Sequence, residues 1–102
     1  MTQCIRMLQS AVDPADIDTV IQLFADDVVP AFSGISGCLG IELLMSVESN
    51  AGGLVEGAAM SRWESREAME KGVNSRPAAE AQVRIVELLR QEPVVRIFEV
   101  RG

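Results

Sequence analysis

The 102-residue sequence predicts an α+β fold in which four strands and three helices follow in the order β-α-β-β-α-α-β. Three observations lead to this order. Four apolar stretches have the length and residue types of strands, other stretches carry apolar residues at helical spacing, and prolines and glycines separate them. A chain of this length is near the common size of one domain, so we expect residues 1–102 to form a single domain.

The N-terminal third is predicted to form a strand followed by a helix. Residues 4–12 are an apolar run of strand length, and Asp13 and Pro14 then provide an N-cap and a first helical residue. Apolar residues at helical spacing continue from there to Val28, so this helix should pack one face on a sheet. Pro30 should end or kink the helix.

The middle of the chain is predicted to form a β-hairpin. In residues 38–47 apolar side chains alternate with a more mixed set, which is typical of a strand with one buried face. The loop at 48–53 is short, polar and ends in glycine, as a hairpin connection should. Residues 54–63 return as the partner strand and place the only tryptophan, Trp63, at its C-terminal end.

The C-terminal third is predicted to form two helices and a closing strand. Ser65 can cap a short helix over residues 66–72, which Gly72 should end. A longer amphipathic helix is predicted over residues 77–91, and residues 94–100 form the last strand.

This order of elements is that of the ferredoxin-like, or split βαβ, fold. Its four-stranded antiparallel sheet has the strand order 4-1-3-2, with helices on one face. Cys4 on the first strand and Cys38 on the second would then lie two strand spacings, about 10 Å, apart. A disulfide requires Cα atoms within about 7 Å, so we expect both thiols to be free within a subunit.

The other face of this sheet carries no helices, although the strands are apolar on both sides. Apolar and charged residues are assigned together to this second face: Arg6, Leu8, Glu42, Leu44, Glu56, Met60 and Arg62. An exposed face with this much apolar surface predicts a partner. Homodimerisation of two sheets would cover it and leave a part-polar, part-apolar chamber in the concavity of each sheet.

Composition and charge exclude several classes of function. The formal net charge is −6 and no basic run is present, so neither nucleic acid nor an anionic membrane is expected as a partner. The chain has no histidine, so a zinc site or a haem site with a histidine ligand has almost nothing to be built from, and we expect no metal. No signal peptide pattern and no apolar run of about 18 residues is present, which predicts a cytoplasmic protein.

The segments SGCLGIEL (36–43) and WESREAME (63–70), with the closing strand VVRIFEV, resemble the antibiotic biosynthesis monooxygenase-like family of dimeric α+β barrel proteins. The resemblance implies a homodimer and a small-molecule pocket between sheet and helices. Some members are cofactor-independent oxygenases of polyketide quinols, and others degrade haem. The histidines that the family often has after the tryptophan have no counterpart in residues 71–78, and the chain has no tyrosine, so haem degradation through histidine ligation is excluded.

The resemblance therefore implies a monooxygenase that acts on a small aromatic or polyketide-like substrate without a cofactor. Such a reaction needs a base, exclusion of water and a hydrogen-bond donor near the developing oxyanion. We assign Glu42 as the base and Trp63 as the wall on which a planar substrate stacks. Asn74 or Arg62 would be the donor. The substrate-binding candidates are Gln9, Met60, Arg62 and Met69.

Each assignment has a simpler structural alternative. Trp63 would more often plug the core at a strand end, and Asn74 would be an ordinary turn residue. Glu42 and Arg62 could form only an ion pair across neighbouring strands. The competing class of function is a non-catalytic dimer, either a small-ligand-binding protein or an accessory subunit of a larger enzyme. An isomerase or cyclase on the same scaffold is a third class of function, because one fold supports many different functions.

Overall fold

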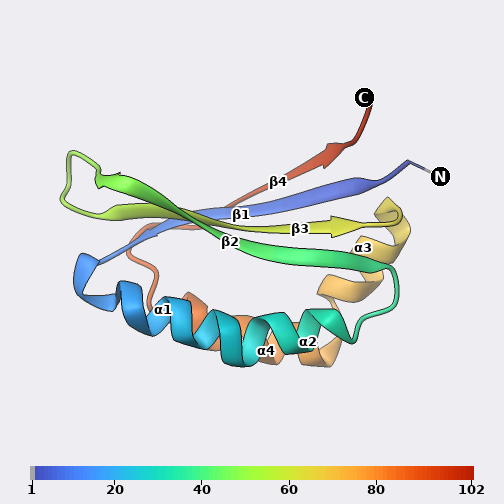
Figure 1. The fold of residues 1–102 in the computed structure, drawn as a ribbon, viewed down its shortest axis with the longest axis horizontal. Helices are drawn as coiled ribbons and strands as arrows, with labels where there is room; N and C mark the ends of the chain where they lie inside the picture. Colours follow the sequence, from blue (N-terminus) through green and yellow to red (C-terminus); the bar gives the residue numbers. More distant parts are fainter. Residues whose placement is uncertain (1) are drawn as a thin grey trace.

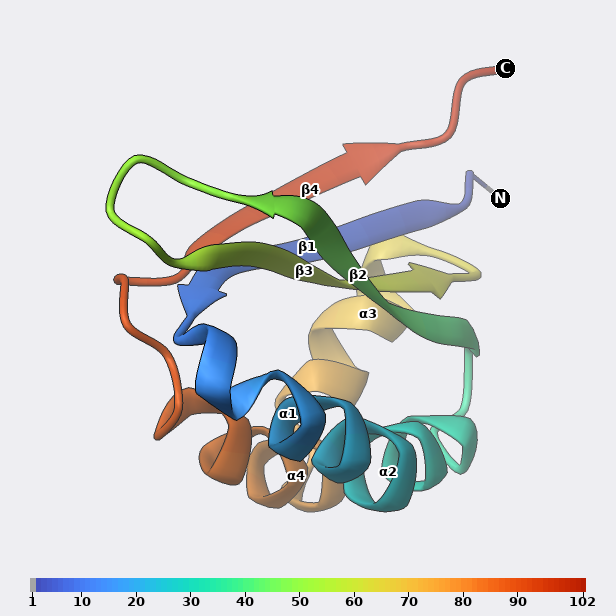
Figure 2. The same ribbon diagram turned by 60° about the vertical axis from the view of Figure 1, so that its left-hand side comes forward.

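The computed structural model describes residues 2–102 and confirms the predicted fold (Figure 1). The four strands are β1 (Cys4–Val12), β2 (Cys38–Ser49), β3 (Val55–Trp63) and β4 (Val94–Glu99). They form one antiparallel sheet in the order β2-β3-β1-β4, as predicted. The helices are α1 (Ile17–Leu23), α2 (Val29–Ser33), α3 (Arg66–Val73) and α4 (Arg76–Val86). All of them lie on one side of the sheet (Figures 1 and 2).

The first helical region runs from residue 14 to residue 33 and changes its hydrogen bonding along the way. It begins with a 3-10 turn at Pro14–Asp16, and the Asp13 carboxylate accepts a hydrogen bond from the Ala15 amide at 2.9 Å, which confirms the N-cap. A π segment, Phe24–Val28, separates α1 from α2. Proline has no amide proton and its ring crowds the preceding turn. The chain accommodates Pro30 with a widened turn, and the helix does not end there.

The two later helices differ from their predicted ends. The Ser65 hydroxyl accepts a hydrogen bond from the Ala68 amide at 3.1 Å, so the predicted cap of α3 is confirmed. Gly72 does not end this helix, which continues to Val73. Gly72 instead lies against the Trp63 ring, where any Cβ atom would collide with ring carbons.

The longer C-terminal helix ends at Val86, five residues before its predicted end at 91. The chain then turns back toward the sheet, where Leu89 forms an isolated β-bridge with Val12. The Arg90 amide donates to the Ala11 carbonyl at 2.8 Å. Pairing with the end of β1 therefore replaces the last predicted turn of the helix.

The core fills the space between the sheet and the helices. Trp63 is completely buried, and its ring meets the Phe32 ring edge-on with the centroids 6.1 Å apart. Cys4 and Cys38 are both free, as predicted. Each lies opposite Trp63 in the strand register, one on β1 and the other on β2, so β3 separates them.

The structure corrects the assignment of Arg6 and Leu8 to the open face of the sheet. Both line a cavity on the helix side, because they alternate in phase with the buried Cys4. Met7 and Gln9 occupy the open face instead. No helix within residues 2–102 has the length and the apolar character needed to cross a membrane.

Candidate functional site

A cavity of about 70 Å³ lies between the sheet and the helices. β1, β2 and β3 form its floor, and α1, the π segment, α2 and α4 form its roof. One water molecule needs roughly 10–15 Å³ of such volume, so the cavity has room for about five water molecules. Met45 is part of the wall, and its unbranched side chain can change conformation to admit a larger ligand. The cavity matches the pocket between sheet and helices that the family resemblance implies.

Four polar side chains interrupt the otherwise apolar lining of the cavity: Arg6, Ser10, Ser61 and Gln82. Two of them are already engaged. The Ser10 hydroxyl donates to a backbone carbonyl at 2.7 Å, and the Gln82 amide donates to another at 3.2 Å. Among the polar residues on the strands, Arg6 and Ser61 therefore keep donors for a ligand.

Ser61 is held in place by Trp63. The indole Nε1 donates a hydrogen bond to Ser61 Oγ at 2.8 Å, and Ser61 is only 2% exposed. An indole can only donate, so the hydroxyl proton of Ser61 is left for another acceptor. No such acceptor is bonded to it among residues 2–102. Ser61 can therefore donate a hydrogen bond to a ligand in the cavity.

Arg6 lies directly opposite Ser61 in the register of β1 and β3. It is half-buried, and within residues 2–102 its guanidinium forms no ion pair. Burial lowers the pKa of the Arg6 guanidinium from its usual value, although an arginine stays protonated at neutral pH. A desolvated cation without a carboxylate partner is costly, and an anionic ligand offsets that cost.

Arg6 is not among the site residues predicted from the sequence. Periodicity correctly placed it in phase with Leu8, but period 2 does not say which face of a strand meets the helices. The signal that identifies the face is Cys4, because a free cysteine is among the residue types most often buried. Cys4 shares the phase of Arg6 along β1.

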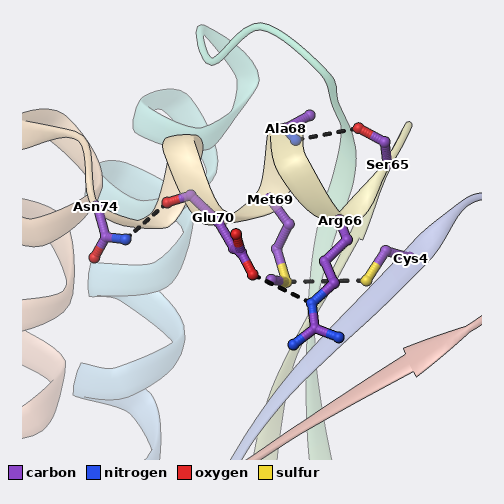
Figure 3. A network of polar contacts seen from close by, with 7 residues as sticks. All are labelled: Cys4, Ser65, Arg66, Ala68, Met69, Glu70 and Asn74. Carbon is purple, nitrogen blue, oxygen red and sulfur yellow. Dashed lines mark hydrogen bonds and ion pairs between the residues drawn. The ribbon is translucent and has the colours of Figure 1, made fainter.

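The seven predicted site residues do not come together in one place. Trp63 and Met69 lie in the core, and neither lines the cavity. The Met69 sulfur is 4.0 Å from the Cys4 sulfur, between α3 and β1 (Figure 3). The Trp63 ring has no exposed surface on which a substrate could stack, which matches the core alternative, and it reaches the cavity only through Ser61.

Four predicted residues, Gln9, Glu42, Met60 and Arg62, lie on the open face of the sheet, away from the cavity. Met60 pairs with both Met7 and Glu42 in the register, and Gln9 lines a shallow hollow on the same face. The Arg62 guanidinium donates to the Gln3 side chain at 3.0 Å. Glu42 and Arg62 form no ion pair within the described chain, so the cross-strand alternative is not formed either.

Asn74, the seventh predicted residue, directly follows α3 and is exposed. Its side-chain amide donates to the Glu70 carbonyl at 2.8 Å (Figure 3). It therefore occupies one of the carbonyl groups that the end of a helix leaves without an intrahelical partner. The catalytic and substrate-binding roles assigned to all seven residues stay predictions.

Comparison with known proteins places the chain in a family. A model of the antibiotic biosynthesis monooxygenase family matches residues 4–84. A search of curated proteins found no match.

Solved structures share the fold over nearly the whole chain. A protein from Bordetella bronchiseptica assigned to the antibiotic biosynthesis monooxygenases is 18% identical, with a TM-score of 0.81 and 100% of both chains covered. One from Caulobacter crescentus CB15 is 16% identical with a TM-score of 0.79, covering 99% of this chain and 92% of that one. A conserved protein from Methanosarcina mazei Go1 is 14% identical with a TM-score of 0.79, covering 99% and 95%. These structures establish the shared fold, and the family match spans most of the sequence: the chain belongs to the antibiotic biosynthesis monooxygenase family.

Proposed function

We propose that the protein is a cofactor-independent monooxygenase that oxidises a small aromatic or polyketide-like substrate in the cavity between sheet and helices. The observation that carries this proposal is the cavity itself, which is apolar apart from a few polar groups and is formed on the fold of the family. A ligand that fills such a site displaces its water, which strengthens the electrostatic interactions inside it.

The proposed reaction inserts one oxygen atom and needs no external reductant. The substrate enol loses its proton to solvent as it binds. The carbon of the resulting enolate, which is a methylene carbon in the keto form, adds O₂ after electron transfer to form a carbon-bound peroxide that takes up a proton from solvent. Loss of water from that peroxide leaves a carbonyl group. Overall R₂CH₂ and O₂ give R₂C=O and H₂O, so the substrate supplies all four electrons that reduce O₂.

Oxygen consumption with a panel of phenols and quinols tests this proposal. A cavity-filling variant, Ala59→Phe, should abolish consumption, because Ala59 lines the cavity between Leu8 and Leu43 of the neighbouring strands. Ala79→Phe, on the exposed side of α4, is the matched control and should leave consumption unchanged. Absence of oxygen uptake with every substrate that binds would contradict the proposal.

A specific observation favours a second candidate function, that of a small-ligand-binding protein without catalysis. Within the described chain the only charged residue that lines the cavity is Arg6, and no carboxylate or thiol lines it to act as a base. A binding protein needs no base, whereas an oxygenase would have to take a substrate that ionises by itself. Tight binding of an aromatic ligand without oxygen uptake would select this candidate.

We also propose that the protein is a homodimer joined through the open faces of its sheets. Both faces of β4 are exposed: Val94 and Phe98 on the open face, Val95 and Ile97 on the other. β4 stands at the edge of the sheet, away from the helices (Figure 2). Apolar surface of this kind on an edge strand is a hazard for a monomer and suits an interface.

A further inference from the structure

We propose that Arg6 and Ser61 form an oxyanion subsite on the sheet side of the cavity, which binds the ionised oxygen of a small phenol or enol. The subsite specifies the ionisation state in which the substrate of the proposed function binds. Its role in catalysis rests on that proposed function. A substrate held as its anion is already electron-rich, so it can react with O₂ without a protein base.

The positions of the two residues make a shared contact with one oxygen atom feasible. Arg6 and Ser61 are Cα partners on adjacent antiparallel strands, and both line the cavity. Directly opposed residues in such a pair have their Cβ atoms about 4.5–5.5 Å apart. The guanidinium and the hydroxyl can therefore approach one ligand atom from two sides.

The charges around Arg6 leave its guanidinium available. Cys4, on the same face of β1, has a thiol whose pKa is raised, first by burial, so it carries no charge near neutral pH. Glu99 lies opposite Cys4 in the register and is ion-paired with Arg101 at 2.7 Å. On β3 and β4 the register partners of Arg6 are Ser61 and Ile97, and the residues of α4 that line the cavity are uncharged. No described carboxylate neutralises Arg6, so the cavity has a net positive charge.

The hydrogen bonds favour an ionised oxygen over a neutral hydroxyl. The Trp63 N–H occupies an acceptor position of Ser61 Oγ, so Ser61 is set to donate into the cavity. Arg6 can only donate. A phenolate accepts from both groups and supplies a counter-charge to Arg6, whereas a neutral phenol leaves the buried charge of Arg6 without one. Hydrogen bonds to an ionised acceptor are also about twice as strong as neutral ones.

Titration of bound 4-nitrophenol, whose ionised form absorbs at longer wavelength than its neutral form, tests the subsite without any turnover. In excess wild-type protein, the pH at which the ligand ionises should fall by about one unit or more relative to free ligand, as for an acid next to an opposite charge. Arg6→Gln should abolish this shift and Arg6→Lys should keep part of it. Ser61→Ala should reduce it.

Arg66→Gln is the matched control, because Arg66 is a solvent-exposed arginine that pairs only with Glu70 on α3. It should give the wild-type shift. Circular dichroism and thermal unfolding verify that each variant is folded. If Arg6→Gln does not fold, the size of the shift in Arg6→Lys still tests the contribution of the guanidinium. A shift that persists in folded Arg6→Gln would overturn the proposal.

Two further ligands show which chemical group the subsite recognises. Nitrobenzene has no ionisable oxygen, so it should bind to the wild type at least tenfold more weakly than nitrophenolate. Its affinity for Arg6→Gln should equal its affinity for the wild type. Displacement of nitrophenolate by benzoate at equal concentration would assign the subsite to carboxylic acids and overturn the assignment to phenols and enols. A clear ionisation shift without oxygen uptake would remove the proposed oxygenase function and leave the subsite standing. Oxygen uptake without the ionisation shift would remove the subsite and leave the oxygenase function standing.

Discussion

At the scale of single residues, the roles of Gly72 and Ser61 depend on their contacts with Trp63. Gly72 lies where the Trp63 ring packs against α3, and Ser61 accepts the hydrogen bond of the Trp63 indole. In the sequence Gly72 has the pattern of a helix stop, and Ser61 has no distinctive pattern at all. Neither role is marked by a sequence pattern, because each depends on where the Trp63 side chain lies in the folded core.

Gly72→Ala should destabilise the protein although alanine favours a helix by about 1 kcal/mol over glycine. The added Cβ would collide with Trp63 and lie 2.9 Å from Ile35 Cγ2, and overpacking of this kind costs about 1–3 kcal/mol. We therefore expect a net loss in the free energy of unfolding, measured in urea. Gly34→Ala, where no atom lies closer than 3.8 Å, is the control and should change stability little. A more stable Gly72→Ala protein would contradict this packing.

Ser61→Ala should lower the free energy of unfolding by about 1–3 kcal/mol, because it leaves the buried Trp63 N–H without an acceptor. The fluorescence of the single tryptophan reports unfolding directly. Ser33→Ala serves for comparison, since Ser33 is exposed and bonds only to the Val29 carbonyl of its own helix. The Ser61 hydrogen bond would be unimportant if both variants lost the same stability.

At the scale of elements, the sequence predicts where segments begin better than where they end. The caps at Asp13 and Ser65 are confirmed, because a cap depends on residues two or three positions away. The predicted end of α4 at residue 91 was wrong, because the chain after Val86 pairs with the end of β1. Likewise, Pro30 is a local signal, yet the π segment that precedes it keeps the helix intact.

Asp13→Ala should cost about 1 kcal/mol, because it removes the acceptor that holds the Ala15 amide at the start of the first helical region. Asp13→Asn keeps an acceptor oxygen at the same position and should retain most of the stability. Chemical denaturation of the two variants beside the wild type measures the difference. Equal losses in both would show that the charge matters and the capping bond does not.

At the scale of the whole molecule, the helices cover only one face of the sheet and leave β4 at its edge (Figures 1 and 2). The proposed dimer would cover the open face. The residues predicted there, Glu42 and Met60 among them, would then lie in or near the interface, outside the cavity of their own subunit. Assembly and ligand binding are thus assigned to opposite faces of one sheet.

Phe98→Glu should convert the dimer to a monomer, because Phe98 is 50% exposed on the open face of β4 and would place a charge in the interface. Light scattering after gel filtration should give about twice the subunit mass of 11.0 kDa for the wild type. Ile21→Glu, at a similarly exposed apolar residue on α1, should remain dimeric. A monomeric wild type would remove the dimer proposal.

The sequence by itself determined the order of the elements, the strand order of the sheet and the helix caps. The element order and the caps follow from hydrophobic period, prolines, glycines and capping residues, which act over a few neighbouring positions. The strand order follows from the ferredoxin-like fold that this element order indicates. Only the tertiary structure decided which face of β1 meets the helices, and with it whether Arg6 is a surface charge or a cavity residue. Period 2 divides a strand into two faces but leaves their surroundings open, because these depend on helices that lie far away in the chain. The predicted site residues were chosen from strand faces and from the segment around Trp63, whereas the cavity is formed by side chains that meet only in the folded protein.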